Sequence, residues 1–83
     1  MSSHFYFNSE DDRTELDPDG TELANIEEGQ KEALALLGRL LQDAEGRSLW
    51  QGKAWRVWVT DGPNGAGNVL FDLQVSANKR NVP

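Results

Sequence analysis

The sequence has no cysteine and a single histidine, His4. The absence of cysteine excludes a disulfide scaffold, a thiolate nucleophile and any zinc or iron–sulfur site that needs sulfur ligands. One histidine excludes a multi-histidine metal site and counts against a histidine-based catalytic triad. We therefore expect no metal site and no cofactor.

Long apolar runs are also absent, since no stretch approaches the roughly 18 residues that a membrane-spanning helix needs. The first residues, Met1 to His4, lack the basic and then apolar order of a secretory signal. A chain of 83 residues holds one hydrophobic core. We expect a single cytoplasmic domain over residues 1–83 without membrane contact, ordered from about residue 4 to 76 and flexible over 77–83.

Basic residues are few, with 8 Lys and Arg against 14 Asp and Glu, so that the net charge is −6. Ten of these acidic residues lie within positions 1–32. An acidic chain repels phosphate backbones, which counts against general nucleic-acid binding. A basic protein partner or self-association is electrostatically easier, although a charge of this size is also normal for a small soluble domain.

The hydrophobic pattern predicts two hairpins separated by one helix. Alternating side chains indicate strands at His4–Asn8, Ala54–Thr60 and Val69–Val75, and Arg13–Leu16 is expected to return as a further strand. Asn25 and Glu28 have the spacing of a capping box at the start of a helix. The helix is expected to bury a broad face made of Ile26, Ala33, Leu34, Leu37, Leu40, Leu41 and Ala44.

Four local signals complete this prediction. Asp17-Pro18-Asp19-Gly20 has the composition of a tight turn, and Asp61–Gly67 is a second turn cluster. Gly46 supplies a stop for the helix. Glycine is unfavourable inside a helix, so Gly29 is expected to allow close approach of a neighbouring backbone.

These elements predict an α+β fold of the order ββαββ, with a single antiparallel or mixed sheet and one helix on one face. The side chains expected beneath the helix are Phe5, Phe7, Trp55, Val57, Val59, Val69, Phe71 and Leu73. Tyr6 and Trp58 are expected on the other face with Leu70 beside them, although a one-residue slip in register would invert this assignment.

The order of several short motifs resembles a family of short bacterial proteins that is catalogued only as a domain of unknown function. The motifs are Phe5-Tyr6-Phe7, Gly20-x-Glu22-Leu23-x-Asn25-Ile26-Glu27, Glu32-Ala33, Gly52-Lys53, Val59-x-Asp61 and Val69-Leu70-Phe71. The family usually has Asp at the position of Asn25 and often Ala at those of Glu28 and Gly29, and its turn is shorter than Asp61–Gly67. The resemblance implies the hairpin–helix–hairpin fold and no assigned activity.

Catalytic and metal-binding patterns are weak. Glu15-x-Asp17-x-Asp19-Gly20 resembles half of a calcium loop, but Ile26 stands where the bidentate Glu belongs, so a turn is the better interpretation. Acidic pairs lie on turns or at the start of the helix, where we expect them to be solvated, whereas acid–base catalysis needs a carboxyl group that is buried. The glycines of Gly62–Gly67 link two strands and lack the strand-to-helix setting of a dinucleotide loop. We therefore expect no enzymatic activity.

The remaining functional hypothesis is an interaction surface on the helix-free face of the sheet, made of Tyr6, Arg56, Trp58 and Leu70. The expected partner is a protein, including another copy of the same chain in a homodimer. The alternative is an accessory nucleic-acid-binding protein that uses Tyr6, Arg56, Trp58 and the basic tail Lys79-Arg80. Burial of one or both aromatic rings in the core is the third interpretation.

Overall fold

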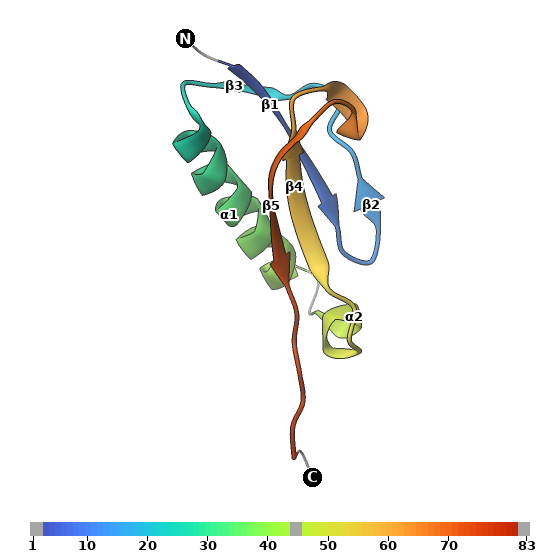
Figure 1. Cartoon of the computed structure of the whole chain (residues 1–83). Coiled ribbons are helices and arrows are strands. Elements are labelled where there is room, and N and C mark those ends of the chain that lie inside the picture. The colour runs from blue at the N-terminus through green and yellow to red at the C-terminus, as the bar shows by residue number, and fades with distance from the viewer. Residues whose placement is uncertain (1–2, 44–45, 82–83) are drawn as a thin grey trace.

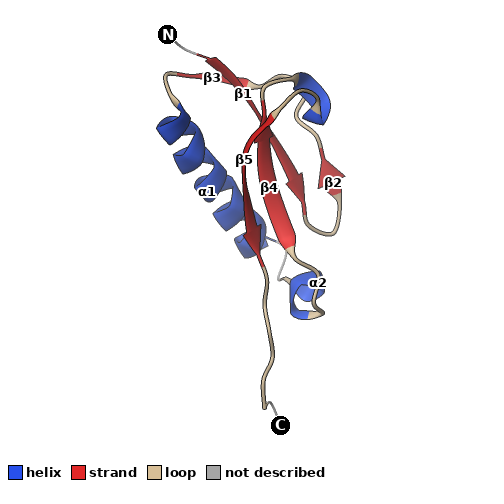
Figure 2. Ribbon diagram, viewed as in Figure 1, coloured by secondary structure: helices blue, strands red, loops and turns tan. Residues whose placement is uncertain are grey.

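The computed structural model describes residues 3–43 and 46–81 and shows an antiparallel sheet with one long helix across one face (Figures 1 and 2). The predicted α+β class with hairpins before and after a helix is therefore confirmed. Ala44 and residues 82–83, which the sequence placed on the helix and in the tail, lie outside the described residues. In chain order the elements are β1 (Ser3–Glu10), β2 (Thr14–Glu15), β3 (Thr21–Leu23), α1 (Ile26–Asp43), α2 (Arg47–Trp50), β4 (Trp55–Thr60), the 3₁₀ turn η1 (Pro63–Gly65) and β5 (Val69–Val75).

Strand β1 organises the sheet, whose order is β2-β1-β4-β5, and β3 also pairs with β1. All of these pairings are antiparallel. On the side away from β4, β1 pairs with β2 at Ser9 and Glu10 and with β3 at residues 3–5. The predicted strand Arg13–Leu16 is therefore shorter than expected, and a second short strand follows it. Residues 17–20 bulge out between the two, so they interrupt one edge of the sheet instead of closing a hairpin.

Helix α1 begins as the capping pattern predicted. The backbone N–H of Glu28 donates to Oδ1 of Asn25 over 2.9 Å, and the Glu28 carboxylate accepts from the N–H of Ala24 over 3.2 Å. Two predictions about its apolar face are wrong, because Ile26 is 41% exposed and Leu34 is 60% exposed. Ile26 is the first helical residue. Leu34 follows the buried Ala33, and because one residue turns the helix by about 100°, Leu34 lies at the margin of the buried stripe.

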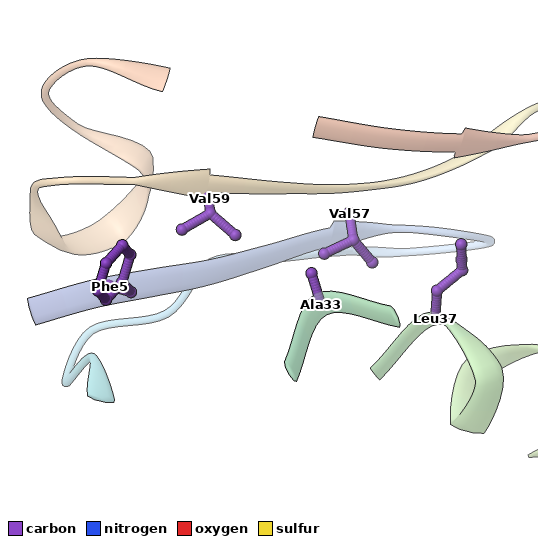
Figure 3. Packing of buried hydrophobic residues seen from close by; sticks show 5 residues of the cluster. All are labelled: Phe5, Ala33, Leu37, Val57 and Val59. Atoms are coloured by element: carbon purple, nitrogen blue, oxygen red, sulfur yellow. The ribbon is translucent and has the colours of Figure 1, made fainter. Parts of the chain in front are cut away.

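The core lies between α1 and the sheet. Phe5 of β1 and the two valines of β4 meet the helix at its buried stripe (Figure 3). Gly29 lies over two rings, since a Cβ there would stand 3.4 Å from Phe5 and 3.6 Å from Phe71. The close approach expected at Gly29 therefore involves aromatic side chains rather than a backbone. The buried cluster is Phe5, Ala33, Leu37, Val57 and Val59, with Phe7, Leu23, Leu36, Leu40, Leu41, Phe71, Leu73 and Val75 packed against it.

A second small cluster closes the far end of the sheet. The indole N–H of the fully buried Trp55 donates to Oγ of Ser48 over 2.9 Å, and Leu49 of α2 is buried. The short helix α2 is absent from the sequence-based prediction. Four residues are too few for a helical period to be recognised.

The prediction for Val69 is also wrong, because this side chain was expected beneath the helix and is instead 56% exposed. Val59 pairs with Phe71 and Thr60 pairs with Val69, so the register shifts between them and Leu70 is the extra residue. A β-bulge of this kind reverses the alternation of side chains on its far side. Phe71 and Leu73 therefore face the core as predicted, whereas Val69 does not.

Candidate functional site

The helix-free face carries three of the four residues that the sequence singled out. Tyr6 pairs with Thr60, and Trp58 lies in one row with Asn8 and Asp72. Tyr6, Arg56 and Trp58 are all half-buried. Their part in binding stays a prediction, because the structure contains no partner.

Tyr6 and Trp58 do not form one continuous exposed patch. Between them lie Asn8 and Thr60, which are fully buried although they point away from α1. The Asn8 side-chain amide donates to the backbone carbonyl oxygens of Tyr6 and Trp58 and to Oγ1 of Thr60, over 3.2–3.3 Å. Polar groups that are buried with such partners stabilise a fold by fixing its geometry. The centre of this face is therefore structural.

Asp17 holds the loop that covers this centre. Its Oδ2 accepts the backbone N–H of Phe7 over 3.0 Å, between the stretches of β1 that pair with β3 and β2. Its Oδ1 accepts from the N–H groups of Asp19 and Gly20, each over 3.0 Å. Its own N–H donates to Oδ1 of Asn8, also over 3.0 Å. Its carbonyl oxygen accepts from the N–H of Asn64 over 2.8 Å, so the loops 16–20 and 62–65 are tied together.

Two carboxyl groups in these loops, those of Asp17 and Asp61, have lowered pKa values, and the causes are structural. Burial would raise the pKa of Asp17, but hydrogen bonds from the backbone N–H groups of Gly20, Phe7 and Asp19 outweigh it and hold that pKa below its usual value. Hydrogen bonds from the backbone and side chain of Asn68 lower the pKa of Asp61. A general acid or base needs a pKa raised toward neutrality, so neither carboxylate has that property.

Arg56 is the cation of the helix-free face. Its guanidinium carbon lies 4.5 Å from the ring centroid of Trp58, which is a cation–π contact, and its buried Nε has no hydrogen-bond partner. The pairing register places Glu10 on one side of Arg56 and Gln74 on the other. Asp72 lies beside Trp58 in the neighbouring row, so the two rows together hold one base and two acids and offer little net positive charge to a phosphate.

Residues 3–43 and 46–81 contain neither a metal-binding cluster nor a membrane-spanning helix. No group of three or more His, Asp or Glu side chains there is placed to hold a metal ion. Both carboxylate oxygens of Asp17 accept backbone N–H groups, so the calcium-loop spacing serves a turn. No helix in these ranges has the length and apolar character needed to cross a bilayer.

The outer edge of β5 is the most prominent unpartnered feature among the described residues. β5 is the last strand of the sheet and pairs with β4 on one side only. It is seven residues long and carries a single charge, Asp72. Leu70, the fourth residue of the predicted surface, lies in its bulge and is 38% exposed.

A groove accompanies this edge. It has a volume of about 270 Å³ and runs between α1 and β5, lined by Gln30 and the exposed Leu34 on the helix and by Phe71, Asp72 and Leu73 on the strand. Sequence reasoning missed this arrangement because strand order determines which strand is at the edge. The near absence of charge in Val69–Val75 is the signal that could have drawn attention to it.

Comparison with known proteins gives one match. Residues 4–76 match the family model described as Domain of unknown function (DUF6894), and the chain belongs to that family. The resemblance to a family of unknown function is thereby confirmed. No curated protein matches the chain, and no solved structure matches it.

Proposed function

We propose that this member of the DUF6894 family is a non-enzymatic protein-interaction module that binds an extended protein segment along the outer edge of β5. The observation that carries the proposal is the free edge itself. A strand at the edge of a sheet presents unpaired N–H and C=O groups, and an added strand can satisfy them. Seven residues of β5 correspond to roughly 23 Å of such edge.

The two edges of the sheet differ in how they are protected. At the opposite edge, β2 has two residues and β3 has three, and the bulge at Asp17 separates them. Short, interrupted and charged edges are the usual means by which proteins prevent unwanted pairing. From Phe71 to Val75, β5 has no proline, no lysine and no bulge. It is therefore the edge at which a strand can be added.

The groove beside β5 supports the same proposal. Successive side chains of an added strand point to opposite faces, so every second side chain would face α1. Leu34 and Leu73 line the groove on that face, which favours apolar side chains at those positions. Arg56 and Trp58 belong to the neighbouring strand β4 and lie on the helix-free face, and Leu70 lies in the bulge of β5. The surface predicted from the sequence therefore borders the proposed site.

The alternative, nucleic-acid binding through the helix-free face, has less support. Stacking of bases needs accessible rings and a surplus of cations. Tyr6 is half-buried against the loop at Gly20, and Arg56 is flanked in its row by Glu10. Single-stranded RNA binding that weakens steeply with salt would favour this alternative over ours.

The proposal is tested by site-specific photo-crosslinking in the native host. A photoreactive amino acid replaces Gln74, an exposed residue of β5, and in a matched protein it replaces Glu15 on β2. We expect defined protein adducts from position 74, no corresponding adducts from position 15, and their loss in the Leu34→Lys variant. Leu16→Lys is the control, since Leu16 is also exposed and follows β2. Equal adducts at both positions, no protein adduct at 74, or adducts to nucleic acid would contradict the proposal.

A further inference from the structure

The chain beyond β5 continues in the direction of the strand and leaves the sheet behind (Figure 1). Val75 pairs with Trp55, the first residue of β4, so the described residues after Val75 extend past the end of the neighbouring strand. Residues 76–81 have no helix or strand, and the molecule measures 54 × 21 × 20 Å. They contain no glycine and no proline.

From this placement we infer that the segment bound at β5 belongs to a second copy of this chain. Residues 77–80 of each copy add to the β5 edge of the other, and the two sheets join through one antiparallel pair of strands. The inference rests on the proposed function, because it uses the same edge and names its occupant. Each chain then supplies both the edge and the strand that covers it, as a two-fold symmetric interface requires.

Symmetry restricts which residues can meet. An antiparallel pair of identical edge strands is related by a two-fold axis normal to the sheet, and that axis leaves each residue on its own face. Directly opposed residues of an antiparallel pair also share a face. Asp72 can therefore face residues 76, 78 or 80 of the other copy, but it cannot face Lys79. Within residues 69–81, Arg80 is the one base that can lie opposite the one acid.

The register that joins Asp72 to Arg80 also matches the side chains between these two residues by character. Ser76 then lies on the two-fold axis. On the helix-free face, Gln74 meets Asn78, and both have amide groups that can exchange hydrogen bonds. On the other face Val75 meets Ala77, and the aliphatic stem of Lys79 lies along Leu73. By contrast, a register centred on Asp72 would place two carboxylates opposite each other, which is destabilising.

The overall charge is compatible with this interface. Ten of the 14 acidic residues lie in the first 32 positions, the part of the chain that contains β1, β2, β3 and the start of α1. Residues 69–81 hold one acid and two bases, so this segment is slightly positive in a chain of net charge −6. Self-association at β5 therefore meets less repulsion than contact through the acidic β2 edge. Nine residues, 72–80, would pair over roughly 30 Å.

The test is a charge-swap cycle measured by sedimentation equilibrium at low ionic strength, over a range of protein concentrations. We expect the wild-type chain to form dimers. Asp72→Arg and Arg80→Asp should each raise the dimer dissociation constant about tenfold, which corresponds to about 1.4 kcal/mol, because each puts two like-charged pairs in the interface. The double variant restores both attractive pairs, and we expect its dissociation constant to return to within about threefold of the wild-type value.

Two control variants test whether the effect is specific to the contact between Asp72 and Arg80. Asp12→Arg makes the same charge change at an exposed site outside the interface, and it should not weaken the dimer. Lys79→Asp makes the same change as Arg80→Asp on the opposite face, and Asp72→Arg should not rescue it. A monomer at all concentrations, failure of the double swap, or equal rescue of Lys79→Asp would each overturn the inference. Photo-crosslinking at position 74 separates the two proposals, since adducts to a different protein would retain the proposed function and refute self-pairing.

Discussion

The substitution Asp17→Ala tests whether the hydrogen bonds of the Asp17 side chain stabilise the folded chain. The substitution removes one carboxylate that accepts three backbone N–H groups. The bonds from Phe7 and Gly20 are partly buried, whereas the bond from Asp19 is exposed, so water can replace only the last one. At about 1–1.5 kcal/mol for each partly buried bond, Asp17→Ala should lower the free energy of unfolding by about 2–3 kcal/mol.

That loss is large for this chain. Domains of this size are stable by roughly 4–12 kcal/mol, so the variant should remain folded but unfold at clearly lower urea concentration. Urea titration followed by tryptophan fluorescence measures it, with an unchanged slope showing that the compactness of both states is preserved. Asp19→Ala is the control and should change the free energy by less than about 0.5 kcal/mol, because its exposed side chain accepts none of these bonds. A loss below 1 kcal/mol for Asp17→Ala, or equal losses for both variants, would refute the role assigned to Asp17.

Three further predictions concern stability. Gly38→Ala should raise the free energy of unfolding by about 0.5–1 kcal/mol in the same titration, because Gly38 lies inside α1 with open space around its Cα, and a neutral or negative effect would contradict this. Gly20→Ala should lower it by more than 1 kcal/mol, since Gly20 has φ +74° and a Cβ there would stand 2.8 Å from the Tyr6 ring; an unchanged midpoint would show that the ring moves aside freely. The pKa values of Asp17 and Asp61 are lowered in the folded chain. Their contribution to the free energy of unfolding is therefore complete above the usual carboxyl pKa of about 3.9 and is lost as the pH falls through the lowered values. Below about pH 4 the temperature of thermal unfolding should fall, and less steeply in Asp17→Ala.

The parts of the fold that depend on local pattern were predictable from the sequence. Asn25 and Glu28 marked the start of the helix, and alternation identified the strands that became β1, β4 and β5. The arrangement that leaves Tyr6 and Trp58 on the face away from α1 follows from the same alternation. These features depend on neighbours within a few residues, which a single sequence displays directly.

The parts that depend on distant partners were not predictable. Asp17 accepts the backbone N–H of Phe7, ten residues away, between the stretches of β1 that pair with β2 and β3. The turn signal of Asp17–Gly20 is local, but it gives no sign of this contact or of the short strand β3 that follows. The bulge at Leu70, which exposes Val69, is set by pairing with β4. Burial of Asn8 and Thr60 needs two loops that meet only in the folded chain. For the same reason, the sequence named Leu70 but not the β5 edge and the groove at Leu34.

We expect a second copy of this chain to be added at the outer edge of β5. Amide hydrogen exchange, measured for dilute and concentrated samples of the wild-type chain, tests it most directly. We expect protection to increase with concentration over residues 72–80 and to stay constant at Thr14–Glu15 of β2. Protection that rises at β2 instead, or that does not depend on concentration anywhere along β5 and residues 76–81, would contradict it.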